Sequence, residues 1–215
     1  MSTRILVADD HTVVRQGLCQ ILGLQPDFEV VAEASTGIQA VELAESEQPD
    51  VVIMDIGMKE LNGIEATAQI LKRSPRSVVL ILSMHSDERY VVRAVRAGAL
   101  GYVLKNAAGD ELVEAIRAVQ NGRSFFSPPV ARLLREARDA SHPEDGICDR
   151  YELLTDRERQ IHQLLAEGNC NKDIANRLNL SLHTVETHRA RIMEKLGVHS
   201  SAELVLGAVR RGLVT

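Results

Sequence analysis

Hydrophobic runs alternate with amphipathic stretches through the first 123 residues. Each of five short apolar runs precedes a stretch whose apolar residues recur at helical spacing. The runs are 5–8, 28–34, 51–54, 78–82 and 101–104, and the helical stretches are 12–23, 37–47, 63–73, 88–97 and 110–121. Continuously apolar strands that alternate with helices indicate a parallel sheet covered on both faces. The pattern predicts an α/β doubly wound fold with five parallel strands and five helices.

The last 65 residues, 151–215, show only helical spacing. Thr155 and Glu158 form a capping-box pattern at the start of a first helix, and Ser181 is placed to cap a third. Two helices that join near Asn179 and Leu180 fit a helix-turn-helix. A fourth helix begins near Ser201. We expect an all-α domain of four helices.

Residues 124–150 interrupt both patterns and form the candidate linker. Pro128, Pro129 and Pro143 fall here, and Ser127 before two prolines favours a short helix through about Ala140. The predicted organisation is a domain over 1–123, a linker with a short helix over 124–150, and a domain over 151–215.

Charge is distributed unevenly over these three segments. Of the 25 basic and 30 acidic residues, 12 and 17 lie in 1–123, 4 and 5 in the linker, and 9 and 8 in 151–215. The net charge of −5 excludes a protein coated with basic residues for nucleic acid, although it permits a local basic face. The asymmetry suggests two roles on one chain.

The remaining composition narrows the class of protein. Three widely spaced cysteines (Cys19, Cys148 and Cys170) argue against a disulfide framework and for a reducing compartment, so a cytoplasmic location is expected. No apolar run is long enough for a membrane span. With 3% aromatic residues, stacking on single-stranded nucleic acid is not expected as the main activity.

Polar residues follow four of the five predicted strands. Asp9 and Asp10 end the first strand and Asp55 the third, while Ser83 and Lys105 end the fourth and fifth. In an open parallel sheet these ends line one crevice. Close carboxylates repel unless a cation joins them, and oxygen donors suit Mg²⁺. The absence of a histidine and cysteine cluster disfavours Zn²⁺.

A carboxylate beside Mg²⁺ can attack a phosphoryl group and form an acyl phosphate. Lys105 would neutralise the phosphoryl oxygens, and the Ser83 hydroxyl would donate to one of them. Each residue also has a simpler interpretation. Asp9 and Asp10 could only cap the following helix, and Lys105 could be a solvated loop residue. The coincidence of suitable residues at four strand ends favours the functional interpretation.

Residues 3–123 resemble the receiver domain of bacterial two-component response regulators. The resemblance rests on six positions: Asp9, Asp10, Asp55 within Asp55-Ile56-Gly57-Met58, Ser83, Tyr102 and Lys105. Residues 153–213 resemble a LuxR-type DNA-binding domain, through Leu153–Glu158, Asn171–Ala175, Thr184–His188 and Lys195–Val198. Together the two halves are similar to the NarL/FixJ group of transcription factors.

The resemblance implies a phosphorylation switch. Asp55 would accept a phosphoryl group from a sensor histidine kinase. Asp10, Asp55 and the carbonyl of Gly57 would hold Mg²⁺, with Asp9 acting through water. Ser83 and Tyr102 would form the switch, and Lys105 would pair with the phosphoryl group. Activation would produce a homodimer that binds double-stranded DNA and controls transcription; no enzyme activity is expected beyond phosphorylation and dephosphorylation of Asp55 itself.

Two positions depart from the receiver pattern. Lys59 replaces a frequent proline in the acceptor loop, and Asn106 replaces a proline that many receivers carry in a cis bond after the lysine. A cis bond before a non-proline residue costs roughly 3 kcal/mol, so the local geometry at Asn106 should differ. Neither change removes a reactive group.

The helix over about 182–196 would enter the major groove of DNA. The candidate DNA contacts are Lys172, Thr184, Glu186, Thr187, His188, Arg189, Arg191 and Lys195. Glu186 departs from the lysine frequent at that position, and Cys170 replaces a frequent serine and is expected to be buried. A domain net charge of +1 predicts weak binding by a monomer, so a dimer is expected. Its candidate face is Ala202, Val205, Leu206 and Val209, which could instead complete the domain core.

Two other functions remain open. A Mg²⁺-dependent phosphatase would use Asp55 as nucleophile, but such enzymes commonly carry an acid two residues later, where this chain has Gly57. The second alternative is a phosphorylation-independent DNA-binding regulator whose receiver switch is degenerate. Lys59 and Asn106 keep that alternative open.

Overall fold

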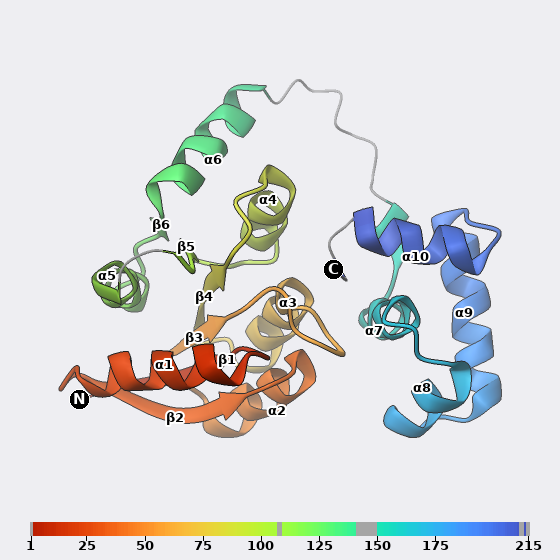
Figure 1. The fold of residues 1–215 in the computed structure, drawn as a ribbon, viewed down its shortest axis with the longest axis horizontal. Helices are drawn as coiled ribbons and strands as arrows, with labels where there is room; N and C mark the ends of the chain where they lie inside the picture. The colour runs from red at the N-terminus through yellow and green to blue at the C-terminus, as the bar shows by residue number, and fades with distance from the viewer. Residues whose placement is uncertain (1, 107–108, 141–149, 211–212, 214–215) are drawn as a thin grey trace. The chain divides into compact units, whose positions relative to one another are not determined.

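The computed structural model describes residues 2–106, 109–140, 150–210 and 213. The chain forms two compact units, residues 1–140 and 141–215. Figure 1 shows the sheet and its helices in the first unit and a group of helices in the second. Among the described helices none is both long and apolar enough to cross a membrane.

The first unit is an α/β fold around one parallel sheet. Its strands have the order β2-β1-β3-β4-β5-β6, and all of the pairs are parallel. Strand β2 lies on one side of β1, and the strands from β3 onward lie on the other side. The strands are β1 (Thr3–Ala8), β2 (Phe28–Ala34), β3 (Val51–Met54), β4 (Val78–Ser83), β5 (Gly101–Leu104) and β6 (Phe125–Phe126). The helices are α1 (Thr12–Gly23), α2 (Gly37–Glu47), α3 (Gly63–Arg73), α4 (Glu88–Arg96), α5 (Gly109–Gln120) and α6 (Pro128–Ala140).

The sheet has six strands, which corrects the five predicted from the sequence. The sixth, β6, pairs in parallel with β5 through Gly101 with Phe125 and Tyr102 with Phe126. A strand of two residues is too short to show a period of two, so hydrophobic patterning could not separate it from the linker.

Successive residues of each strand point to opposite faces of the sheet, and a hydrophobic core lies on each face. Leu6, Val52 and Ile81 face α2, α3 and α4. Their neighbours Ile5, Val51 and Leu80 face α1 and α5. Helices thus cover both faces, as Figure 1 also shows. The prediction of a buried parallel sheet is confirmed.

The beginning of the predicted linker packs as part of the first unit. The Ser127 N–H donates to the Tyr102 carbonyl at 3.0 Å, and the Leu104 N–H donates to Ser127 Oγ at 3.2 Å. Val130 on α6 is fully buried in the same core as Tyr102. The helix predicted through Ala140 is therefore present and is anchored to β5. Residues 141–149, with Pro143 and Cys148, lie outside the described residues.

The second unit is helical. It contains a 3-10 helix (Arg150–Leu153) followed by α7 (Asp156–Ala166), α8 (Asn171–Arg177), α9 (Leu182–Leu196) and α10 (Ser201–Arg210). The short 3-10 turn adds to the four helices that the sequence predicted. The capping box of Thr155 and Glu158 is present, and Ser181 caps α9 by accepting the Thr184 N–H. Helices α8 and α9 are joined by Leu178–Ser181, which includes Asn179 in a left-handed conformation. This is the predicted helix-turn-helix.

Candidate functional sites: an acidic crevice and a helix-turn-helix

The strand register brings the predicted acidic residues together. Ala8 is paired with Met54, so Asp9 and Asp55 leave adjacent strands at the same level. The Asp55 N–H donates to the Ala8 carbonyl at 2.9 Å, which extends the pairing to the start of the loop. Ser83 is paired with Leu104, so Lys105 follows at the same edge. We call Asp9, Asp10, Asp55 and Lys105 the acidic crevice.

Lys105 bridges two buried carboxylates. Its Nζ lies 2.7 Å from Asp9 Oδ2 and 3.0 Å from Asp55 Oδ2. The side chains of Asp9, Asp55 and Lys105 are 1%, 6% and 10% exposed. Burial raises the pKa of Asp55, and the positive charge of Lys105 offsets only part of that rise. Burial opposes the charged form of Lys105, but its hydrogen bond to Asp9 and the charge of Asp55 outweigh it and raise its pKa.

Asp10 and His11 complete a set of metal-ligand types. One ligand atom from each of Asp9, Asp10, His11 and Asp55 lies within 4.8 Å of all the others. His11 Nδ1 is 2.8 Å from Asp10 Oδ1 and 3.3 Å from Asp9 Oδ1. Three carboxylates lie here beside one ammonium, that of Lys105, so the group carries excess negative charge. Carboxylate oxygens are hard donors. The donor set therefore fits a divalent cation.

Close backbone packing positions the loop after Asp55. A Cβ on Gly63 would meet the Asp55 carbonyl oxygen at 1.9 Å, so only glycine permits α3 to begin there. Asn62 caps that helix by accepting the N–H groups of Ile64 and Glu65. Gly57 is exposed beside the crevice, and a Cβ there would lie 3.7 Å from Asp55 Oδ2.

The predicted switch residues meet at the loop after β4. Ser83 is fully buried, and its Oγ accepts the His85 N–H at 3.1 Å. The Tyr102 hydroxyl donates to the His85 carbonyl at 2.6 Å. Burial raises the pKa of Tyr102 to about 12. The His85 ring stacks on Tyr90 with centroids 4.4 Å apart. Ser83 and Tyr102 therefore contact the same loop residue, with Tyr102 turned inward.

The two departures from the receiver pattern leave the crevice intact. The Lys59 side chain is exposed, and its carbonyl accepts the Leu61 N–H at 2.7 Å. All peptide bonds in the described ranges are trans, and the Lys105–Asn106 bond is among them. The absence of a cis bond is the expected consequence of asparagine at this position.

Helix α9 presents the predicted DNA contacts to different degrees. Glu186 and Arg191 are exposed, as is Lys172 on α8. Four others are partly exposed: Thr184, Thr187, His188 and Arg189. Val185 and Ile192 are fully buried in the core of the second unit, which fixes the face of α9 that remains outside.

Lys195 has a partner within its own domain. Its Nζ lies 2.7 Å from Glu158 Oε2, and Glu158 is buried at the N-terminus of α7. This ion pair ties the end of α9 to the capping box. The interaction gives Lys195 a structural role beside the predicted DNA contact.

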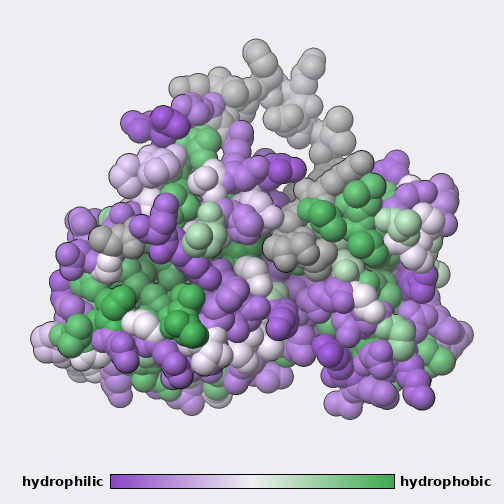
Figure 2. All heavy atoms as spheres, in the orientation of Figure 1, coloured by the Kyte–Doolittle hydropathy of each residue, from purple (hydrophilic) through white to green (hydrophobic). Residues whose placement is uncertain are grey.

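The candidate dimer residues lie outside the core. Ala202, Leu206 and Val209 are exposed and Val205 is half-buried, while Leu204 and Ala208 on the same helix enter the core. Leu206 and Val209 are 48% and 47% exposed. Figure 2 shows hydrophobic residues gathered over α10. Core completion therefore falls to other residues of α10.

Cys170 is exposed, so the prediction that it is buried was wrong. It occupies the N-cap of α8, where the side chain leaves the helix, and its Sγ lies 2.9 Å from Asp173 Oδ2.

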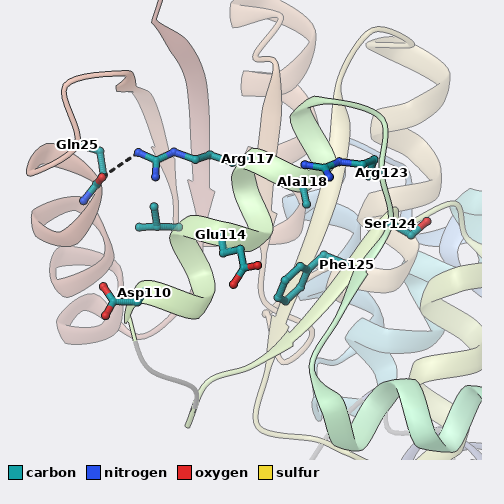
Figure 3. A pocket seen from close by; sticks show the side chains of 9 residues that line it. Gln25, Asp110, Glu114, Arg117, Ala118, Arg123, Ser124 and Phe125 are labelled. Carbon is teal, nitrogen blue, oxygen red and sulfur yellow. Dashed lines mark hydrogen bonds between the residues drawn. The ribbon is translucent and has the colours of Figure 1, made fainter.

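A hollow of about 590 Å³ lies along α5, away from the acidic crevice. Figure 3 shows Arg117 reaching Gln25, while Asp110 and Glu114 lie along the same helix. Arg117 also pairs with Asp27. Charges of both signs line this surface, and no residue predicted from the sequence for the site lies in it.

Sequence reasoning missed three residues around the crevice. His11 contacts both acids of the pair, Arg15 donates to the Asp9 carbonyl at 2.7 Å, and His85 links Ser83 to Tyr102. Of these three, only His11 could have been identified from the sequence, because it directly follows the acidic pair Asp9-Asp10. The other two act through backbone groups, which a residue pattern does not display.

Each unit of the chain matches a known protein family. Residues 5–117 match the family described as response regulator receiver domain, and residues 152–208 match bacterial regulatory proteins of the luxR family. The chain is 39% identical to the oxygen regulatory protein NreC of Staphylococcus carnosus over 98% of this chain and 99% of that protein. It is 36% identical to the transcriptional regulatory protein DegU of Brevibacillus brevis, over 98% of this chain and 94% of that protein.

Solved structures give the same assignment. A LuxR-family two-component response regulator from Aurantimonas sp. is 37% identical, with a TM-score of 0.62 over 65% of this chain and 99% of that one. RcsB, in a structure of two dimers bound to two parallel DNAs, is 26% identical, with a TM-score of 0.60 over 97% of this chain and all of that one. The chain belongs to the two-component response regulators that join a receiver domain to a LuxR-type DNA-binding domain.

Proposed function

We propose that this response regulator is switched by phosphorylation of Asp55, with Mg²⁺ bound in the acidic crevice. The observation that carries the proposal is the position of Lys105 between Asp9 and Asp55, with Asp10 beside them. One buried ammonium against this many acids leaves net negative charge, which a divalent cation would neutralise. The phosphoryl donor would be a histidine of a sensor kinase.

The acceptor step uses few protein groups. An oxygen of the Asp55 carboxylate forms a bond to phosphorus, the bond from phosphorus to the donor histidine nitrogen breaks, and that nitrogen keeps the electron pair. Asp10, Asp55 and the Gly57 carbonyl would hold Mg²⁺, with Asp9 acting through water. An ion held by these residues would supply positive charge to neutralise the phosphoryl oxygens. Lys105 pairs with the same oxygens once it leaves Asp55.

The chemistry stops at Asp55. Position 57 is glycine and is exposed, so the loop offers no second acid there to protonate a leaving group or activate water. This favours a regulator that phosphorylates and dephosphorylates its own aspartate over a phosphatase acting on other substrates.

The switch follows from contacts that already meet near β5. The acyl phosphate would carry about −1.5 to −2 charges at Asp55, in place of the single negative charge of the carboxylate. The Ser83 hydroxyl would move to this group and release the His85 N–H, which changes the loop that Tyr102 also holds. Because the Tyr102 carbonyl binds Ser127, a shift of β5 would reach β6 and α6. The linker helix is thus a direct neighbour of the switch.

The output is binding of double-stranded DNA by a homodimer. Exposed Glu186 and Arg191 on α9 are placed to read base edges, and Lys172 is placed to contact the backbone. The weakly charged domain favours two half-sites about 34 Å apart over one. The exposed α10 face would form the dimer. The RcsB structure supports a dimer on DNA, because it contains RcsB dimers bound to DNA.

The test measures DNA affinity as a function of phosphorylation. Duplexes would be selected from a random pool with full-length protein, Mg²⁺ and acetyl phosphate. The dissociation constant of an enriched duplex is then measured with and without acetyl phosphate, for the wild type and for Asp55→Asn. We expect the phosphodonor to tighten binding by wild type only, and Leu206→Glu to weaken binding by the phosphorylated protein.

Two outcomes would contradict the proposal. Equal affinity with and without phosphodonor would indicate the phosphorylation-independent regulator. A phosphodonor effect that survives in Asp55→Asn would move the switch to another residue. Thermal unfolding of each variant separates loss of function from loss of fold.

A further inference from the structure

Ser127 lies between β6 and α6, at the point where the linker leaves the sheet, and it is 2% exposed. Its hydroxyl accepts the Leu104 N–H at 3.2 Å and donates to the carboxylate of Glu111 on α5. We propose that Ser127 is a positioning residue of the phosphoryl-acceptor site, because it fixes the backbone from which Lys105 extends. The inference rests on the proposed function, since it concerns the phosphorylation of Asp55.

The Ser127 hydroxyl replaces a backbone group of the sheet. The Ser127 N–H donates to the Tyr102 carbonyl at 3.0 Å. In a regular parallel ladder the Ser127 carbonyl would in turn accept the Leu104 N–H. That carbonyl instead accepts the Ala131 N–H at 2.9 Å, in the first turn of α6. The hydroxyl therefore satisfies a buried N–H that the start of the helix would otherwise leave without an acceptor.

The two prolines that follow Ser127 favour this use of its side chain. A serine that precedes a helix normally caps it by accepting N–H groups of the first turn. Pro128 and Pro129 have no N–H, so the first two of these donors are absent. The hydroxyl is thus available to β5.

Glu111 sets the direction of the hydroxyl. A serine hydroxyl carries one hydrogen and two acceptor lone pairs. Because the hydrogen is donated to the Glu111 carboxylate, a lone pair is left for the Leu104 N–H. Hydrogen bonds to a charged acceptor are stronger than neutral ones, and linked hydrogen bonds polarise one another. Glu111 belongs to the first turn of α5, so three elements (β5, α5 and the start of α6) meet at this hydroxyl.

The contact matters for Lys105 because of its place in the chain. The N–H that Ser127 holds belongs to the residue directly before Lys105. The Lys105 N–H itself donates to the Ser83 carbonyl at 2.9 Å, so β5 is held from both sides at its end. The Lys105 ammonium reaches Asp9 and Asp55 from this backbone. Phosphoryl transfer depends on the position of such groups, so a shift of the backbone should slow it.

The experiment measures the rate of phosphorylation of the full-length chain by acetyl phosphate with Mg²⁺, followed by intact mass. Ser127→Ala removes the hydroxyl. Ser124→Ala is the matched control, because Ser124 is exposed directly before β6. Titration calorimetry gives the Mg²⁺ dissociation constant of each protein, and thermal unfolding monitors the fold.

We expect Ser127→Ala to slow phosphorylation of Asp55 by about fivefold, a factor that one hydrogen bond of ordinary net strength can supply. The Mg²⁺ dissociation constant should change by less than about twofold, because the carboxylate ligands remain. Ser124→Ala should react at the wild-type rate. A role confined to anchoring α6 would instead lower thermal stability and leave the rate unchanged.

Variants of Glu111 test the same contact from its other side. Glu111→Ala should slow the reaction as Ser127→Ala does, whereas Glu111→Gln keeps an acceptor for the hydroxyl and should restore most of the rate. Glu114→Ala, at an exposed position of α5, controls for the lost charge. The double variant of Ser127→Ala with Glu111→Ala should be no slower than Ser127→Ala alone, because both changes remove one linked contact. The Glu111 series also decides the question if Ser127→Ala does not fold.

The outcomes separate this inference from the proposed function. If wild type is modified on Asp55 and both alanine variants react at its rate, the positioning role is wrong and the proposed function stands. A loss of Mg²⁺ affinity as large as the loss of rate would also overturn the inference, because it would indicate general damage to the acidic crevice. If wild type is not modified, or Asp55→Asn is modified equally, both proposals fail.

Discussion

The acidic crevice and helix α9 hold their charged groups in opposite ways. In the crevice Asp9 and Asp55 are buried, and each is paired with Lys105, whose side chain is 10% exposed. On α9, Glu186 and Arg191 lie in solvent. A buried charge without a partner is costly, whereas an exposed charge costs little. Substitutions in the crevice should therefore alter stability and chemistry together, and substitutions on the outer face of α9 should alter only binding.

The two regions also differ in how the fold positions their side chains. The crevice is assembled before any phosphoryl group arrives, because strand pairing sets the distance between Asp9 and Asp55. The outer face of α9 is set by the burial of Val185 and Ile192, and exposed side chains such as that of Arg191 project from it. Lys195 is the intermediate case, since it belongs to α9 but pairs with buried Glu158.

The largest expected effect is the removal of the buried cation. Lys105→Met would leave Asp9 and Asp55 without their shared partner, and we expect a loss of about 3 kcal/mol in the free energy of unfolding of the first unit. Urea unfolding measures it. Lys59→Met is the matched control, because Lys59 is exposed on the neighbouring loop. Equal stabilities for the two variants would show that the crevice does not depend on its buried ammonium.

The next largest effect should be a weaker affinity for DNA with no change in thermal stability. Arg191→Ala removes an exposed guanidinium from α9, and we expect about tenfold weaker binding to the selected duplex. Thermal unfolding should match that of the wild type. Arg132→Ala, at an exposed position of α6 in the first unit, serves as the control for total charge. A fall in stability, or an unchanged dissociation constant, would contradict the assignment of this face to DNA.

The smallest expected effect concerns the ion pair between Lys195 and Glu158. Burial alone would raise the pKa of Glu158, but hydrogen bonds from Lys195 and the Thr155 N–H outweigh it and lower the pKa. A lowered pKa stabilises the fold above the unfolded-state value of 4.5, and this contribution is lost as pH falls through the folded-state value.

Lys195→Met should therefore reduce the acid sensitivity of the second unit. The stability change at neutral pH should stay below about 1 kcal/mol, because Lys195 is 33% exposed and Glu158 keeps the hydrogen bond from the Thr155 N–H. Unfolding of full-length protein between pH 3 and 7, followed by signals from the second unit, measures both quantities. The same slope with pH in both proteins would show that the ion pair contributes nothing to stability.

The same contrast explains what the sequence could predict. Asp9, Asp55 and Lys105 were predictable because each follows an apolar run, and parallel strands bring such ends together. Strand β6 was not, since Phe125 and Phe126 are too few to show a period. The contact of Lys195 with Glu158 spans 37 residues. Helical spacing identified the inner face of α9, but it could not show which outer residues have partners.

The central claim is that Asp55 accepts a phosphoryl group, and intact-mass spectrometry tests it most directly. Full-length wild type and Asp55→Asn would be incubated with Mg²⁺ and acetyl phosphate, with oligomeric state measured in parallel. The predicted result is one phosphoryl adduct on wild type alone, accompanied by dimer formation. The absence of an adduct under conditions that modify a known receiver, or an adduct that persists in Asp55→Asn, would contradict the claim.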